Sequence, residues 1–204
     1  MTTVLITAFE PYDDWPENSS WLALMELTRE LPAQPQVVTR RYPVDFEAAR
    51  ARLTEDLAAN YDFALHLGQA PGISRVHLEA IGINIGGHSG QSPDQFQPLA
   101  PGGPAAYQSA LPLADWSAKI RELGIPCQVS YHAGTYLCNA LLYLTHHIAA
   151  GGRLKTRAAF IHFPLAPAQV LDPRQGGPSL PSSQCAAAVR LILHELHSLG
   201  ERWT

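Results

Sequence analysis

Short apolar runs alternate along this chain with segments in which apolar residues recur every three or four positions. Apolar runs of this length predict buried β-strands, and the three-to-four spacing predicts helices. Strands and helices that alternate with short links indicate a parallel or mixed sheet covered by helices. We therefore expect an α/β fold: one domain over residues 1–204, built as a three-layer α/β/α sandwich around a mixed, mostly parallel sheet. The expected strands are 4–9, 36–42, 61–68, 76–85, 125–131 and 157–164, and the expected helices are 21–31, 46–60, 113–123, 138–150 and 184–199.

Several connections lie where such a fold carries function. Ligands in these sheets usually bind beyond the carboxyl ends of the strands. The loops at 9–20 and 68–75, with those after Tyr131 and Phe160, are therefore the expected surroundings of a site. The segment 86–104 is rich in Gly, Pro, Ser and Gln and is too long for a simple link. It is either a lid or interface loop, or an ordered but passive excursion.

Composition narrows the class of protein. A length of 204 residues with 46% hydrophobic and 16% charged residues fits one globular domain with a sizeable core. A net charge of −4 without a basic block argues against nucleic-acid binding. The sequence contains no run of about 18 apolar residues, so it gives no indication of a membrane span. The segment 1–7 lacks the features of a signal peptide. We expect a cytoplasmic protein.

The three cysteines, Cys127, Cys138 and Cys185, are too few and too widely spaced for a disulfide framework or a CxxC metal site. This usage agrees with a reducing compartment. The zinc motif HExxH, the Walker loop, a GxGxxG loop after a strand and the GxSxG elbow are all absent from the sequence. The chain therefore offers no support for a zinc enzyme, a nucleotide-phosphate site or a serine hydrolase of the elbow type.

The segment 133–143 places a cysteine at a helix start. It follows a strand-like run, contains the turn residue Gly134 and leads into Leu141 and Leu142 at helical spacing. Cys138 is therefore expected in the first helical turn, where free backbone N–H groups and the positive end of the dipole favour a thiolate and can hold a developing oxyanion. Cys138 is a candidate nucleophile, and the alternative is a buried, inert cysteine.

A cysteine nucleophile needs a histidine to share its proton and a third group to orient that ring. Of the nine histidines, His162 is best placed, since it ends an apolar strand just before Pro164, and His66 is a rival on similar grounds. Glu79 is a lone carboxylate in an apolar strand, so it either faces solvent or has a partner. These residues are a candidate catalytic trio of Cys138, His162 and Glu79. The alternative is three unrelated buried or edge residues.

Four short segments carry a further signal through their order and spacing. They are Thr7-Ala8-Phe9-Glu10-Pro11-Tyr12, then Gly68-Gln69-Ala70-Pro71-Gly72 with Leu78-Glu79 and Asn84, then Ala133-Gly134-Thr135-Tyr136-Leu137-Cys138-Asn139 with Tyr143, and finally Phe160-Ile161-His162-Phe163-Pro164. Together they resemble the motifs of pyroglutamyl peptidase I, a cysteine peptidase family also called pyrrolidone carboxyl peptidase. The resemblance covers nearly the whole chain.

The resemblance implies a reaction and a set of roles. The reaction is hydrolytic removal of an N-terminal pyroglutamyl residue from a peptide or amide. Cys138 is implied as the nucleophile, His162 as the proton carrier and Glu79 as the group that orients His162. Phe9 and Tyr12 match the aromatic residues that sandwich the lactam ring, and Gln69 lies in the loop expected to bond it.

The resemblance also bears on cofactors and partners. It implies no metal and no organic cofactor. The expected partner is a small peptide or amide that begins with pyroglutamate, and neither nucleic acid nor membrane is expected. Members of the family are often tetrameric, which implies a homo-oligomer with the apolar loop 96–104 as a candidate interface.

Several positions depart from the family's pattern, all outside the trio. Ala8 stands where the family has glycine, Asp13-Asp14 where it has Gly-Gly, and Ile73 and Ala80 where it has basic residues. The added carboxylates are expected to make the mouth of the pocket more acidic. The leading hypothesis is an active pyroglutamyl peptidase with a changed preference. The alternative is a relative that binds a small ligand or partner with the altered pocket, or hydrolyses a different small amide.

Overall fold

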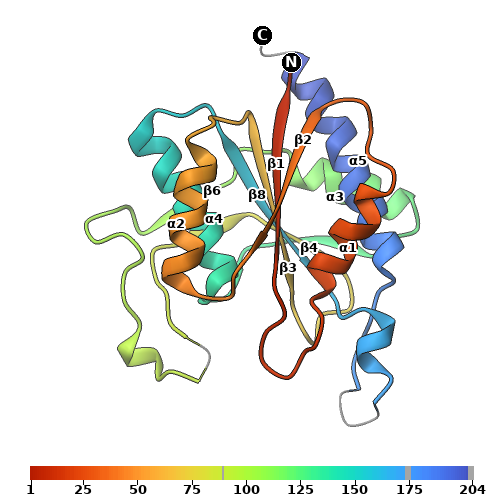
Figure 1. The fold of residues 1–204 in the computed structure, drawn as a ribbon, viewed down its shortest axis with the longest axis horizontal. Helices are drawn as coiled ribbons and strands as arrows, with labels where there is room; N and C mark the ends of the chain where they lie inside the picture. The colour runs from red at the N-terminus through yellow and green to blue at the C-terminus, as the bar shows by residue number, and fades with distance from the viewer. Residues whose placement is uncertain (89, 173–175, 202–204) are drawn as a thin grey trace.

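The computed structural model describes residues 1–88, 90–172 and 176–201. Its centre is a six-stranded sheet in the order β2-β1-β3-β8-β4-β7 (Figure 1). β2, β1, β3 and β8 run parallel, whereas β4 is antiparallel to β8 and parallel to β7. The expected mixed, mostly parallel sheet is confirmed. The strands are β1 (Thr3–Phe9), β2 (Gln36–Tyr42), β3 (Phe63–Gln69), β4 (Val76–Glu79), β7 (Cys127–Ser130) and β8 (Arg157–Phe163).

Helices cover both faces of the sheet, which confirms the expected three-layer sandwich (Figure 1). The helices α1, α3 and α5 pack on one face and α2 and α4 on the other. Within the described ranges, no helix combines the length and the apolar character needed to cross a membrane. The helices are α1 (Ser19–Thr28), α2 (Phe46–Leu57), α3 (Leu113–Glu122), α4 (Leu137–Gly152) and α5 (Ser182–Glu201), with short 3₁₀ turns η1 (Pro93–Gln95) and η2 (Pro167–Val170).

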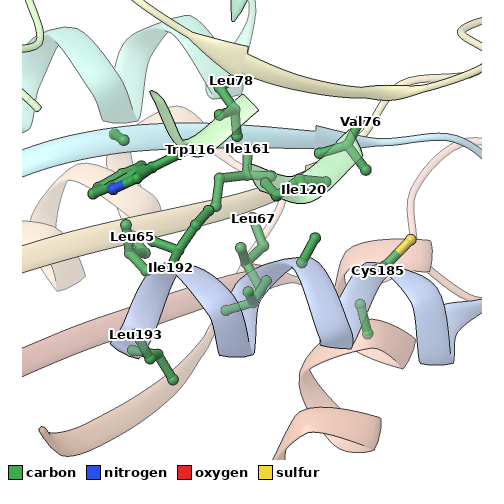
Figure 2. Packing of buried hydrophobic residues seen from close by; sticks show 14 of the residues in the cluster. Leu65, Leu67, Val76, Leu78, Trp116, Ile120, Ile161, Cys185, Ile192 and Leu193 are labelled. Atoms are coloured by element: carbon green, nitrogen blue, oxygen red, sulfur yellow. The ribbon is translucent and has the colours of Figure 1, made fainter. Parts of the chain in front are cut away.

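The core between the sheet, α3 and α5 is built around Trp116 (Figure 2). Its ring is fully buried and belongs to the same cluster as Leu78 and Ile161 of the sheet and Ile192 of α5. Its indole N–H has no hydrogen-bond partner within the described residues. Packing of the ring, rather than a polar contact, is therefore what Trp116 contributes.

The strand expected over 76–85 is interrupted. After β4, the short strand β5 (Ile81–Ile83) leaves the main sheet and pairs with β6 (Ala106–Gln108). The glycine of β5 explains the departure, because a Cβ at Gly82 would lie 2.7 Å from the backbone nitrogen of Tyr143. The backbone of β5 therefore packs directly on α4, which only glycine permits. Apolar alternation alone gives no sign of this bend.

The long excursion over 86–104 is held by its own hydrogen bonds. Asn84 donates from Nδ2 to the carbonyl of Ala100 at 2.8 Å and accepts the amide of Ala100 on Oδ1 at 2.9 Å. Gly86 and Gln97 exchange backbone hydrogen bonds of 2.8 and 3.0 Å. The excursion projects at the lower left of Figure 1. One amide on it, that of Gly87, bonds the carbonyl of Thr135 at 3.0 Å, just before α4.

The core around Trp116 generates a stability prediction. We expect Trp116→Ala to lower the free energy of unfolding by about 3–5 kcal/mol, because it removes a large buried ring and leaves a cavity. Trp116→Phe keeps most of the packing and loses an N–H that has no partner in the described chain, so its cost is expected to be less than half as large. Urea unfolding with unchanged m values measures both. Equal losses in the two variants would contradict the packing interpretation.

Candidate active site

Cys138 is the second residue of α4. The turn before the helix contains Gly134, whose φ of +81° is a conformation that glycine adopts without strain. The first hydrogen bond inside the helix runs from the amide of Ala140 to the carbonyl of Tyr136 at 3.0 Å. The amide of Cys138, like its neighbours in the first turn, therefore has no partner within the helix. These amides and the helix dipole surround the thiol with positive potential.

Asn139 fixes the start of α4 against β5. Its side chain is fully buried. Its Oδ1 accepts the amide of Ile83 at 2.8 Å, and its Nδ2 donates to the carbonyls of Ile83 and Ile85 at 2.9 Å each. The side chain thus supplies the hydrogen bonds that a neighbouring strand would otherwise give to β5. As a result the first turn of α4, and Cys138 with it, has one fixed position relative to β5.

Space for the thiol comes from Gly68, near the end of β3. A Cβ at this position would lie 3.1 Å from Sγ of Cys138 and 2.6 Å from Cζ of Phe160. Any other residue would push either the sulfur or the ring out of place. Gly68 is also the register partner of His162 on β8. The absent side chain therefore lets cysteine and histidine meet over the sheet.

The structure brings together the three residues of the expected trio. His162 lies near the end of β8 and Glu79 at the end of the adjacent, antiparallel β4. Nδ1 of His162 lies 2.8 Å from Oε1 of Glu79, and both side chains are buried. A carboxylate only accepts hydrogen bonds, so Nδ1 carries the proton. The side chain of Cys138 is also close enough to His162 to raise the pKa of the ring. The ring therefore lies beside both a carboxylate and a thiol.

The charge state of His162 follows from these two partners. Burial by itself lowers the pKa of the ring. The side chain of Cys138, followed by the hydrogen bond and charge of Glu79, outweighs burial and raises the pKa of His162 to about 10. The imidazole is therefore positively charged at neutral pH. A buried cation needs paired groups around it, and the thiol and the carboxylate provide them.

A second histidine, His77, also lies near Oε1 of Glu79. Its Nδ1 is 3.9 Å from Oε1 of Glu79, and its Nε2 is 2.9 Å from the amide nitrogen of Gln128. An amide NH₂ only donates, so Nε2 accepts and the ring proton faces Glu79. Desolvation lowers the pKa of His77, while the charge of Glu79 acts against that shift. His77 is thus neutral, with its ring proton towards Glu79 but beyond hydrogen-bond distance.

His66, the alternative candidate for the catalytic histidine, has a structural role instead. It is fully buried on β3, with Nδ1 2.8 Å from the hydroxyl of Thr7 and Nε2 2.8 Å from the hydroxyl of Thr145. Thr145 donates its own proton to the carbonyl of Leu141 at 2.7 Å, so it accepts from Nε2 of His66. Burial lowers the pKa of His66 to about 3. A neutral ring with both nitrogens occupied joins β1, β3 and α4.

A cavity of about 170 Å³ opens beside Cys138. Phe9 at the end of β1 and Tyr12 in the loop after it supply aromatic walls. Gln69, at the end of β3, adds an amide. The structure therefore brings all three expected binding residues to the cavity that the thiol borders. The other lining residues are Asn18, Val44, Tyr136 and Leu137.

The amide of Gln69 has a fixed orientation. Its Oε1 accepts the backbone amide of Ser19 at 2.7 Å and the side-chain Nε2 of Gln169 at 2.8 Å. Since two donors hold the oxygen, the NH₂ group has to face the other way. That Nε2 is buried without a well-formed hydrogen bond among the residues described, although it acts on the hydroxyl of Tyr12, whose pKa burial raises and the Gln69 amide partly lowers. A buried donor of this kind in a cavity wall is suited to a ligand carbonyl.

Comparison with known proteins settles the family. The chain matches the pyroglutamyl peptidase family over residues 2–197. The protein belongs to this family. A pyrrolidone-carboxylate peptidase of Streptomyces coelicolor is 38% identical over 200 residues, covering 95% of this chain and 91% of the relative. Another from Pyrococcus furiosus is 36% identical over 208 residues, covering 95% of this chain and 99% of the relative.

Solved structures agree with this assignment. A mutant pyrrolidone carboxyl peptidase from Pyrococcus furiosus superposes with a TM-score of 0.88 at 31% identity, covering 98% of this chain and 99% of that one. Pyroglutamyl peptidase I of Bacillus amyloliquefaciens gives 0.87 at 30% identity, covering 97% and 98%. The membership therefore extends over the whole fold and not only over the short motifs.

The positions that depart from the family's pattern differ in how near they lie to the cavity beside Cys138. Ala8 and Ala80 are buried, and neither they nor Ile73 and Asp14 line the cavity beside Cys138. Asp13 does not line it either, but it borders a second hollow directly outside. Of these departures, Asp13 is therefore the one placed to touch a ligand.

Two supporting residues, Gln169 and His77, lie outside the set of site residues expected from the sequence, and only His77 has a local signal. Gln169 orients Gln69 although 100 positions separate the two, and it lies in a Pro-rich loop without a pattern of its own. His77 shares one face of a strand with Glu79 by the period-two rule, which is the signal that points to their contact. No comparable local signal exists for Gln169.

The three cysteines are predicted to differ in reactivity. Burial raises the pKa of Cys127, and it raises the pKa of Cys185 to about 12. Both thiols are shielded, whereas Cys138 is only half-buried. We expect iodoacetamide to alkylate Cys138 first, with the other two protected until unfolding. Peptide mapping by mass spectrometry measures the order.

His162→Ala should slow alkylation of Cys138 about tenfold or more, because the paired imidazolium is lost. His194→Ala on the exposed side of α5 is the matched control and should leave the rate unchanged. Equal and slow labelling of all three cysteines would exclude an activated thiol at position 138.

Proposed function

We propose that this protein hydrolyses the amide bond that follows an N-terminal pyroglutamyl residue, with Cys138, His162 and Glu79 as catalytic residues. The observation that carries the proposal is the cavity in which the thiol, two aromatic rings and the buried amide of Gln69 meet. The names of the relatives, pyrrolidone-carboxylate peptidases, support the same substrate class.

Recognition of the lactam uses shape and one directed hydrogen bond. The ring is small, flat and uncharged, so aromatic walls from Phe9 and Tyr12 suit it. Nε2 of Gln69 donates to the lactam carbonyl, which satisfies a donor that is otherwise buried without a well-formed hydrogen bond. An N-terminal glutamine that has not cyclised carries a free amino group and a side-chain amide. These are more polar groups than this wall can satisfy, so the cavity favours the lactam.

Acylation begins with attack of the Cys138 thiolate on the pyroglutamyl carbonyl carbon. A C–S bond forms, and the carbonyl oxygen becomes an oxyanion. The backbone amides in the first turn of α4, which have no helical acceptor, stabilise that oxyanion. His162 then gives its proton to the leaving amine as the C–N bond breaks.

Deacylation uses the same groups in reverse. Water replaces the departed amine, and His162 takes a proton from it as the water oxygen attacks the thioester. Collapse of the second tetrahedral intermediate breaks the C–S bond and restores the thiolate and imidazolium. Glu79 holds the Nδ1 proton throughout, so Nε2 faces the reacting atoms in every step. No metal or cofactor enters this sequence.

The proposed chemistry favours a reducing compartment, but it does not bear on whether the protein forms a homo-oligomer. A free thiol at position 138 is required, and all three cysteines are unpaired in the structure. We therefore propose a reducing, cytoplasmic setting. Assembly into a homo-oligomer through the loop 96–104 stays a prediction.

The reaction itself gives a direct test. The wild-type protein should release the fluorophore from a pyroglutamyl-aminocoumarin amide, and Cys138→Ala should lower kcat by at least about 10³-fold, because the nucleophile is lost. Cys185→Ala is the matched control for loss of a thiol away from the cavity, and it should keep activity. Absence of turnover by the wild-type protein would contradict the proposed function.

Glu79→Gln tests the charge on His162. The substitution removes the carboxylate that helps to raise the pKa of the ring, so that pKa falls. In the wild-type protein the imidazolium is lost as the pH rises through about 10. The alkaline limb of kcat/KM should therefore move to lower pH in the variant, and kcat at neutral pH should fall about 10³- to 10⁴-fold.

A pH–rate profile measures both effects, with Glu55→Gln on the exposed surface of α2 as the control. An unshifted alkaline limb in Glu79→Gln would mean that Glu79 does not set the protonation of His162.

A further inference from the structure

A second hollow of about 310 Å³ lies directly outside the cavity of Cys138. The two share the side chains of Tyr12 and Tyr136, which are walls of both. A substrate whose lactam fills the inner cavity and whose carbonyl lies at the thiol has to send its leaving part out past these rings. The outer hollow is a space into which that leaving part can extend.

The outer hollow is framed by two loops that are more than 70 positions apart in the sequence. Asp13 comes from the turn after β1, and Gly87 and His88 come from the excursion over 86–104. The ring of His88 packs at 4.9 Å against Phe46 and at 6.2 Å against Tyr136. The long excursion therefore supplies a wall of the hollow, which is a more specific role than that of a passive link.

Asp13 is held in this wall by a tight turn. Tyr12 accepts the amide of Trp15 at 3.1 Å, and Asp13 between them has φ of 49°. That left-handed conformation suits glycine best, but Asp and Asn adopt it more readily than other residues. The turn therefore fixes the position of the Asp13 backbone. Aspartate in this position adds a carboxylate that glycine would lack.

The carboxylate of Asp13 has no counter-charge beside it. It makes no hydrogen bond or ion pair with any residue that the structure describes, and no described lysine or arginine lines the hollow. Burial raises the pKa of Tyr12 to about 12, and the negative charge of Asp13 adds to that rise. Desolvation also raises the pKa of Tyr136, with Asp13 adding to it. The field of Asp13 thus reaches both rings between the cavities.

We propose that the outer hollow receives the residue that follows pyroglutamate, and that Asp13 makes the protein prefer a cationic side chain, lysine or arginine, at that position. This inference rests on the proposed function. The unpaired carboxylate meets the cation, and the rings of Tyr12 and Tyr136 pack against its aliphatic stem. Because Asp13 is exposed to solvent, the preference is modest and weakens with salt.

Two substrates of equal shape isolate the charge. Pyroglutamyl-arginine amide and pyroglutamyl-citrulline amide differ in the charge of the second side chain and little in its size. We expect the wild-type kcat/KM to be about 2- to 5-fold higher for the arginine substrate at low ionic strength. The ratio should fall towards one at about 0.5 M salt, where charges on the surface are screened.

Asp13→Asn should remove the preference without disturbing the turn, since asparagine also accepts a positive φ. The expected ratio of the two kcat/KM values in this variant is about one. Asp14→Asn is the matched control: it removes a neighbouring charge that lines neither hollow, so the preference should persist.

The outcomes separate this inference from the proposed function. Turnover of both substrates with equal kcat/KM, or a ratio that Asp13→Asn leaves unchanged, would overturn the role of Asp13 while the proposed function stands. No turnover of either substrate would remove the proposed function, and the subsite with it. A wild-type preference that both salt and Asp13→Asn abolish supports the proposal.

Discussion

The hydrogen bond between His162 and Glu79 is the contact on which the site depends, because it fixes the ring and, together with Cys138, keeps a buried positive charge stable. A buried imidazole on its own loses its proton, as His66 shows on the neighbouring strand. The two histidines differ in what faces them: hydroxyl groups for His66, a carboxylate and a thiol for His162. The same residue type is therefore a neutral strut in one place and a charged proton carrier in the other.

The reversed direction of β4 makes this contact. His162 is paired directly with His77 across the strands, and Glu79 lies two residues further along on the same face. A diagonal neighbour of this kind is within reach of a long side chain. Two glycines then allow the backbone to pack closely enough for the thiol of Cys138 to reach the ring of His162. Gly68 leaves room for the sulfur on β3, and Gly82 lets β5 lie directly against the backbone of α4.

Much of this could be predicted from the sequence, since it rests on local periodicity and on motifs. Apolar runs and helical spacing predict the sandwich, and the glycine turn before a helix predicts the position of Cys138. The pairing of β5 with β6 escapes prediction because it depends on the long-range contact of Gly82 with α4. The part played by Gln169 escapes it for a related reason: its partner is distant, and a loop has no period that reveals which side chains turn inward.

The inner cavity and its mouth obey different constraints. Inside, almost every atom that orients the substrate is tied to the fold: the amide of Gln69 is locked by Ser19 and Gln169, and the thiol is fixed by the start of α4. A change there disturbs packing or leaves a buried polar group without a partner. At the mouth, the turn that carries Asp13 asks only for a residue that accepts a positive φ. Aspartate meets that demand and adds a charge at little structural cost. A substitution in this turn can therefore change what the mouth offers to a substrate while the buried contacts in the sheet stay intact.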